Sequence, residues 1–270
     1  MVAFEQIISH RFRGFGAHES TMGSMIAALD FGVRQLEFDI RFTRCGTPIV
    51  THDEHARDAR GHRHHLKDVT AAQLPQLGGD FAHMSRAEDM FEAIAAHPNT
   101  ECRLLVDVKD AGFEDMLYAL VARHRLRAHC LWVSWLPEVL YAIRDLDANA
   151  SLCLSHWCEP PGAATRAVHR VFEAKGNAIP RPERRFVTGE RSGWFVNGAL
   201  RGEMRELVDW VCVPSGSVSR ALVEDYHRSG IKLSALSYIS AAAMQAAEDR
   251  FGHDAFFSDA SEPFEALQPK

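Results

Sequence analysis

The chain has no long apolar run, and its beginning has no leader-like pattern. The longest apolar runs in its 270 residues fall far short of the ~18 consecutive apolar residues that a membrane-spanning helix needs. The first residues, MVAFEQIISHRFRG, contain no basic segment followed by a long apolar one, as a secretion signal would. We therefore expect a cytoplasmic protein without stable insertion in a membrane.

The chain also lacks a basic tract. Its net charge is −6, and acidic and basic residues are interspersed. No stripe of basic and aromatic residues indicates nucleic acid as a partner. An anionic substrate would need a local positive site, because the charge of the whole molecule would not attract it.

Cysteine pairs typical of a zinc site are missing as well. Cys153 and Cys158 have four residues between them, but no second pair of cysteines matches this spacing, which argues against zinc. We expect reduced thiols, as is usual in cytoplasmic proteins. The six cysteines are Cys45, Cys102, Cys130, Cys153, Cys158 and Cys212.

Short β-branched apolar runs alternate along the chain with amphipathic helical stretches. This pattern is typical of a parallel α/β protein, and 270 residues is close to the roughly 250 residues of a (β/α)8 barrel. The runs make eight or nine strands, against the eight of a closed barrel. The predicted strands are Gln6–Ser9, Gln35–Ile40, Pro48–Thr51, Arg103–Val108, Cys130–Ser134, Ser151–Leu154, Trp210–Val213 and Ile231–Leu236, with a further short run at Ala255–Phe257.

Two features break the regular alternation. Only eight residues separate Asp39 from Pro48, too few for a crossover helix. More than fifty residues, rich in Arg, Pro and Gly, separate Leu154 from Trp210, where one helix would suffice. We therefore predict one domain over residues 1–270, a distorted (β/α)8 TIM barrel with an insertion at about 157–207, between the sixth and seventh predicted strands.

Three carboxylates lie on two of the predicted strands. Glu37 and Asp39 are two residues apart, so both side chains would point into the barrel. An edge strand with its acids in solvent is the alternative. Asp107 and Lys109, also two apart, end another apolar strand, and an internal ion pair is the alternative there. Three carboxylates make a hard oxygen site that suits Mg²⁺ or Ca²⁺.

His10 and His52 each directly follow a predicted strand, where the active sites of such barrels lie. Imidazole titrates near neutral pH, so two histidines beside one site suit a general base and a general acid. Arg11 and Lys109 could both reach a phosphate. Together with the carboxylates, these groups are what hydrolysis of a phosphodiester needs.

The order and spacing of these residues resemble the glycerophosphodiester phosphodiesterase family. That family has His-Arg near its N-terminus, then Glu-x-Asp about 25 residues later, then His-Asp. Its other motifs correspond to residues 18–21, to the turn at 43–46 that replaces a crossover helix, and to residues 107–109, 134–135 and 258–259. The three leading motifs read here as His10-Arg11, Glu37-Phe38-Asp39 and His52-Asp53.

The resemblance implies hydrolysis of a small phosphodiester, with a glycerophosphodiester giving an alcohol and glycerol 3-phosphate. It implies a divalent cation, Mg²⁺ or Ca²⁺, as cofactor. By residue, it implies metal ligation by Glu37, Asp39 and Asp107, acid–base catalysis by His10 and His52, and phosphate contact by Arg11 and Lys109.

The chain departs from the family pattern at three places. Phe12 and Arg13 are added before Gly14, Asp107 stands for a glutamate, and Leu236-Ser237-Tyr238-Ile239 stands for Trp-Thr-Val-Asn on the last strand. The aromatic wall beside the substrate headgroup is therefore missing, and Trp157 or Trp194-Phe195 would replace it or simply pack in the core. A lysophospholipase D or sphingomyelinase D-like enzyme and a non-catalytic barrel that binds a phosphorylated ligand are the alternative functions.

Overall fold

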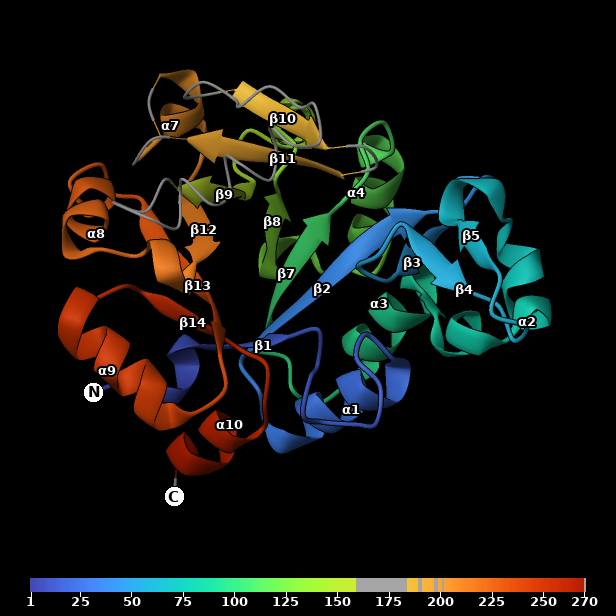
Figure 1. Cartoon of the computed structure of the whole chain (residues 1–270), viewed down its shortest axis with the longest axis horizontal. Coiled ribbons are helices and arrows are strands. Elements are labelled where there is room, and N and C mark those ends of the chain that lie inside the picture. The colour runs from blue at the N-terminus through green and yellow to red at the C-terminus, as the bar shows by residue number, and fades with distance from the viewer. Residues whose placement is uncertain (159–183, 189–190, 197–198, 201, 270) are drawn as a thin grey trace.

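Eight parallel strands close into a barrel (Figure 1). The computed structural model describes residues 1–158, 184–188, 191–196, 199–200 and 202–269, and the side chains of 1–156, 199–200 and 202–269. Closure is direct, because β1 pairs in parallel with both β2 and β14, and the predicted α/β barrel is confirmed. The barrel strands are β1 (Ile7–His10), β2 (Gln35–Phe42), β7 (Arg103–Val108), β8 (Cys130–Ser134), β9 (Ser151–Cys158), β12 (Trp210–Pro214), β13 (Lys232–Tyr238) and β14 (Ala255–Ser258).

The helices lie around the outside of the barrel (Figure 1). Side chains alternate along each strand, so each strand contributes residues both to the core beneath the helices and to the barrel interior. On β2, Leu36, Phe38 and Ile40 pack in the outer core with the helices. Ile8, Leu105, Leu131, Val133, Cys153, Cys212 and Phe257 are among the residues of a second cluster, which fills the barrel interior. The helices are α1 (Met22–Phe31), α2 (Leu74–Leu77), α3 (Ala87–Ala96), α4 (Glu114–Arg123), α5 (Pro137–Leu146), α7 (Glu203–Leu207), α8 (Arg220–His227), α9 (Ala241–Phe251) and α10 (Glu262–Leu267).

The third predicted strand does not belong to the barrel. It is β3 (Pro48–Val50), which runs antiparallel to β2 as the second arm of a hairpin and pairs on its other side with β6 (Ser85–Arg86). The short connection from Asp39 to Pro48 is this hairpin turn. Beyond it, β4 (His55–Arg57) and β5 (Arg63–His65) form a separate two-stranded sheet. The predicted excess over eight strands is thereby explained.

The predicted insertion lies between β9 and β12, which are the fifth and sixth strands of the barrel once β3 is set apart. Its described parts include β10 (Arg184–Thr188) and β11 (Arg191–Val196), an antiparallel pair, with β11 continuing in parallel beside β9. The hairpin lies over the barrel rim in Figure 1. The side chains of Trp157, Trp194 and Phe195 lie outside the described ones, as does the backbone of residues 159–183.

His253 is a buried histidine away from the barrel's acidic residues, and it makes stability depend on pH. Its ring is 1% exposed and contacts the rings of Tyr238 and Phe256. The Tyr238 hydroxyl lies 3.2 Å from its Nε2, and its Nδ1 has no hydrogen-bond partner among the described residues. Burial lowers the pKa of His253 to about 4.

We predict that folding keeps His253 neutral where the unfolded chain would protonate it. The folded pKa lies below the unfolded value of about 6.5, so this stabilisation is complete above pH 6.5 and is lost as pH falls towards 4. The loss is about 3 kcal/mol of unfolding free energy. Urea unfolding between pH 6.5 and 4 should show a smaller loss in His253→Gln than in the wild type. Equal losses in the two proteins would contradict the prediction.

Candidate functional site

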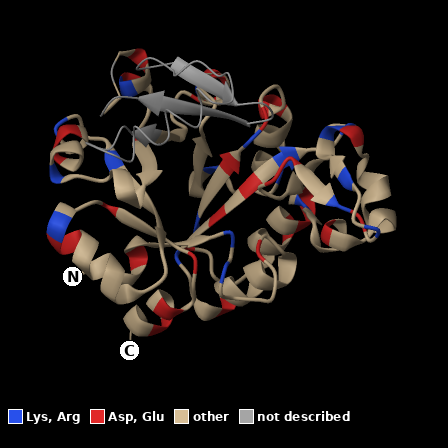
Figure 2. Ribbon diagram, in the orientation of Figure 1, with Lys and Arg blue, Asp and Glu red and all other residues tan. Residues whose placement is uncertain are grey.

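The three predicted carboxylates meet towards the C-terminal ends of neighbouring strands. In the parallel pairing of β2 with β7, Asp39 lies beside Asp107, and in the pairing of β1 with β2, His10 lies beside Glu37. Figure 2 shows the acidic positions along β2 and at the end of β7. Every residue of β2 is buried, so the alternative of a solvated edge strand is wrong.

The carboxylates form a compact oxygen cluster. Glu37, Asp39 and Asp107 are 2%, 1% and 6% exposed, and one oxygen from each lies within 4.8 Å of the others. Within the described part of the chain, Asp107 Oδ1 is buried without a hydrogen-bond partner. Oxygen donors at this spacing, one of them unsatisfied, fit a hard divalent cation such as Mg²⁺ or Ca²⁺. We call Glu37, Asp39 and Asp107 the carboxylate cluster.

Two cations whose side chains are mostly covered lie against the cluster. Arg11 Nε is 3.0 Å from Asp39 Oδ2, and Lys109 Nζ is 2.9 Å from Asp39 Oδ1 and 2.5 Å from Asp107 Oδ2. The ion pair expected as an alternative for Asp107 and Lys109 therefore exists, but as part of the cluster. The Trp135 ring covers Lys109, with its centroid 5.2 Å from Nζ. Two cations do not balance three ionised carboxylates.

The pKa values of Glu37 and Asp39 are shifted in opposite directions. Burial raises the pKa of Glu37 well above its ordinary value, and the negative charge of Asp39 raises it further. Burial also disfavours the ionised form of Asp39, but Lys109 and Arg11 outweigh it and hold the pKa of Asp39 below its usual range. Two neighbouring carboxyl groups with pKa values shifted in opposite directions, such as Glu37 and Asp39, are common in active sites.

His10 and His52 approach this cluster from two strands. His10 Nε2 is 3.8 Å from Glu37 Oε2, and its Nδ1 is 2.6 Å from Asp259 Oδ1. His52 Nδ1 is 2.8 Å from Asp53 Oδ1, and the charge of His52 contributes to lowering the pKa of Asp39. Burial is the main cause that lowers the pKa of both histidines.

Backbone contacts hold His52 beside β2. The Thr51 amide donates to the Asp39 carbonyl over 3.0 Å, and the Arg41 Nε donates to the His52 carbonyl over 2.7 Å. Arg41 in turn pairs with buried Asp110 at 3.0 Å, and Asp110 also accepts from the Phe42 amide. The position of His52 therefore depends on the β2–β3 hairpin and on the loop after β7.

The loop after β1 aims Arg11 at the cluster. Arg11 and Phe12 have positive φ values of 56° and 60°, which residues other than glycine rarely adopt. Phe12 is fully buried against Phe38, and the Arg11 amide donates to the Glu37 carbonyl over 3.0 Å. Burial of Phe12 thus offsets the strain that directs the Arg11 side chain towards Asp39.

Gly14 fixes the far end of this loop, and we predict that a side chain there distorts it. Its φ is +84°, and an added Cβ would clash with the Ser261 amide nitrogen. Gly61 has a similar φ of +83° with open space around it, which makes Gly61→Ala a matched control. Gly61→Ala should cost about 1–2 kcal/mol of unfolding free energy from the backbone conformation alone. Gly14→Ala should cost clearly more, as measured by urea unfolding, and equal costs would argue against the close contact.

Six of the seven predicted site residues are linked by direct contacts, and His52 lies beside them. Sequence reasoning left Asp259 and Arg13 out of the site. Arg13 Nη1 lies 2.7 Å from Asp259 Oδ1, the same oxygen that contacts His10. The signal for Asp259 was its place directly after the last strand, which closes the barrel on β1. The signal for Arg13 was its insertion beside the His10-Arg11 motif.

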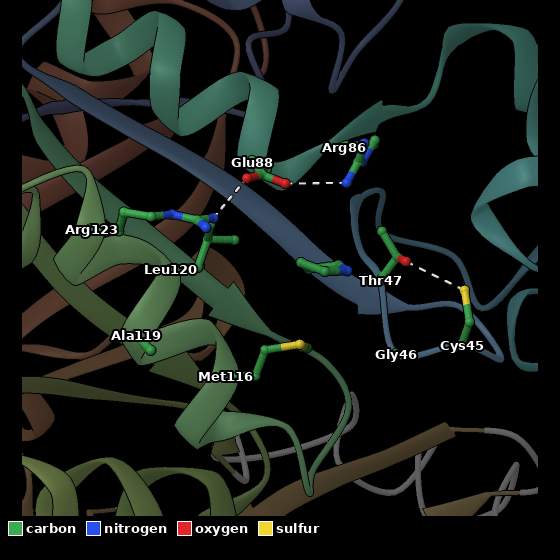
Figure 3. Close-up of a pocket in the computed structure, with 10 residues that line it drawn as sticks. Cys45, Gly46, Thr47, Arg86, Glu88, Met116, Ala119, Leu120 and Arg123 are labelled. Carbon is green, nitrogen blue, oxygen red and sulfur yellow. Dashed lines mark hydrogen bonds and ion pairs between the residues drawn. The ribbon is translucent and has the colours of Figure 1, made fainter.

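Two cavities lie near the barrel rim. One of about 340 Å³ adjoins His52 and is lined also by Glu19, Asp53 and His83. Figure 3 shows the other, of about 490 Å³, where Glu88 pairs with Arg86 and Arg123 and where Cys45 hydrogen-bonds Thr47. None of the seven predicted site residues lines this second cavity. Within the described residues, no helix is both long and apolar enough to cross a membrane.

Residues 9–140 match the model of the Glycerophosphoryl diester phosphodiesterase family. A curated relative, glycerophosphodiester phosphodiesterase 1 of Bos taurus, is 28% identical over 159 residues, which cover 55% of this chain and 48% of that protein. The match thus spans about half the length of that relative.

Solved structures share the whole fold. A protein of Silicibacter pomeroyi, named for glycerophosphoryl diester phosphodiesterase activity, has a TM-score of 0.72 at 18% identity and covers 99% of this chain and 94% of its own. A phosphodiesterase of Oleispira antarctica, solved with the product sn-glycerol-3-phosphate, has a TM-score of 0.66 at 17% identity, covering 97% and 95%. The motifs, the match over residues 9–140 and the shared barrel agree, and this part of the chain is similar to the glycerophosphodiester phosphodiesterase family.

Proposed function

We propose that this chain is a divalent-cation-dependent phosphodiesterase that hydrolyses glycerophosphodiesters to an alcohol and glycerol 3-phosphate, and that residues 1–270 act as one catalytic domain. The observation that carries the proposal is the buried carboxylate cluster with His10 and His52 beside it and two cations against it. The family match and the product complex of the Oleispira antarctica neighbour favour the same reaction.

The carboxylate cluster is proposed to hold the cation, Mg²⁺ or Ca²⁺. Its donors are hard oxygens, and Asp107 Oδ1 is unsatisfied. When bound, the cation supplies positive charge that stabilises the phosphate and lowers the pKa of an attacking hydroxyl group. Arg11 and Lys109 are proposed to orient the phosphate oxygens, since both cations already contact Asp39 of the cluster.

His10 and His52 are proposed to move the protons. One removes a proton from the attacking hydroxyl group, and the other donates a proton to the leaving alkoxide. Each histidine bonds a carboxylate through Nδ1, so Nε2 is the nitrogen left for the substrate. The cavity beside His52 is large enough to take the alcohol portion of a small diester.

We predict that millimolar Mg²⁺ or Ca²⁺ raises the melting temperature of the wild-type protein. Binding to the folded state alone stabilises it, by about 2.7 kcal/mol at a hundredfold excess over the dissociation constant. Asp107→Asn should lose most of this shift in differential scanning fluorimetry, because it removes the unsatisfied oxygen charge. Glu101→Gln, on an exposed surface pair with Arg34, should keep the shift. A full shift in Asp107→Asn would place the cation elsewhere.

We predict that His52→Ala lowers kcat for glycerophosphocholine about 10²- to 10⁴-fold, the usual contribution of a general acid or base. Folding should change little, because Arg41 holds the backbone carbonyl of His52, which the variant keeps. Phosphorus NMR would identify glycerol 3-phosphate, with EDTA and exposed His62→Ala as controls. Lysophosphatidylcholine belongs in the same panel, because its turnover alone would replace the proposal with a lipid-headgroup activity. Folded, metal-bound protein without turnover of any diester would contradict both.

A further inference from the structure

Asp259 contacts His10 on the side away from the carboxylate cluster. Asp259 follows β14, and its amide donates to the Tyr238 carbonyl over 2.8 Å, which fixes its backbone to β13. His10 Nδ1 lies 2.6 Å from Asp259 Oδ1, and the His10 and Phe257 rings make a T-shaped contact, with centroids 5.6 Å apart at 87°. The imidazole is therefore held by a hydrogen bond and by a ring contact.

The partners of Asp259 determine which atom carries the hydrogen. Arg13 Nη1 donates to Oδ1 over 2.7 Å, and Ser237 Oγ donates to Oδ2 over 2.5 Å. A carboxylate surrounded by donors has no proton to give, so the contact with His10 requires a hydrogen on Nδ1. In a neutral imidazole, Nε2 then carries the lone pair, and Nε2 is the atom 3.8 Å from Glu37.

We propose that Asp259, held by Arg13 and Ser237, is a positioning residue that fixes His10 as the Nδ1–H tautomer with Nε2 directed at the carboxylate cluster. Arg13 also pairs with Glu19, so one guanidinium ties the loop after β1 to the end of β14. The added residues Phe12-Arg13 thereby take a role in the site. The proposal rests on the proposed function only where catalysis is the readout.

The geometry makes an unusual prediction about two substitutions of the same residue. Arg13 and His10 donate to one and the same oxygen of Asp259. In Asp259→Asn, Arg13 should keep the amide oxygen in that place, because a guanidinium cannot accept from an NH₂ group. His10 should then retain its Nδ1–H tautomer, whereas Asp259→Ala removes the acceptor and should release it.

Tautomers can be read directly from long-range ¹H–¹⁵N spectra of the full chain with labelled histidine, with His10 assigned by its loss in His10→Gln. We expect Nδ1–H in the wild type and in Asp259→Asn, and its loss in Asp259→Ala. When Arg13→Met is added to Asp259→Asn, the side-chain amide at position 259 is no longer held by Arg13. The double variant should therefore also lose the Nδ1–H tautomer of His10. Retention of Nδ1–H in Asp259→Ala would overturn the proposal, and retention in the double variant would overturn the role of Arg13.

Kinetics supply the second readout. Asp259→Ala should lower kcat on the order of 10³-fold with little change in KM, by analogy with other orienting carboxylates. Asp259→Asn should lose about tenfold, because it keeps the orientation but not the charge. Asp30→Ala is the matched control, since exposed Asp30 also bonds a histidine, His97, at 3.1 Å outside the site.

Failure of the two proposals can be told apart. The spectra are recorded without substrate, so they test the tautomer even if the wild type hydrolyses no diester. An active wild type with unchanged kcat in folded Asp259→Ala would overturn the positioning role alone. A rise in KM with unchanged kcat in Arg13→Met would show that Arg13 contacts substrate and would overturn its positioning role. Asp259→Asn keeps the test open should the alanine variant fail to fold.

Discussion

The burial of three carboxylates close together in the barrel is the constraint on which the rest of the site depends. Ionised groups removed from water are costly unless charges and hydrogen bonds compensate them. Arg11 and Lys109 supply two positive charges at 3.0 Å or less from the acids, and burial and the charge of Asp39 still raise the pKa of Glu37. The buried carboxylates need positive charge beside them. The strained loop after β1 supplies it by directing Arg11 at Asp39, and the end of β7 supplies it with the buried side chain of Lys109.

A second ring of carboxylates holds the groups that face the cluster. Asp259 bonds His10, Asp53 bonds His52, and Asp110 bonds Arg41, which in turn holds the backbone of His52. Each of these acids follows a strand directly or within three residues. The carboxylate cluster therefore lies on the strands, and the acids that hold its neighbouring side chains lie in the loops just beyond strand ends.

The sequence was informative wherever the signal is local. Arg103–Val108 and Cys130–Ser134 were predicted with their observed bounds, because uninterrupted apolar runs between polar segments define buried parallel strands. The two-residue spacing of Glu37 and Asp39 likewise predicted a shared side of the strand. The direction of Pro48–Val50 could not be read in the same way, since an apolar strand looks alike in a hairpin and in a barrel. Asp259 was matched to the motif at 258–259 but left out of the site, because its partner, His10, lies 249 positions away and meets it only when β14 closes on β1.

The charge imbalance would also couple binding of the proposed cation to the protonation of Glu37. With all three acids ionised, charges of −3 and +2 leave the cluster at −1, and burial together with the negative charge of Asp39 raises the pKa of Glu37. A divalent cation would remove that repulsion and favour the ionised form of the same group, so binding and deprotonation of Glu37 promote each other. Lys109 already occupies the space between Asp39 and Asp107, and an arriving cation must share those oxygens with it. The shorter Asp107, in place of the family's glutamate, draws its carboxylate closer to the strand, and Lys109 bonds one of its oxygens while the other has no hydrogen-bond partner among the described residues and would be open to the proposed cation.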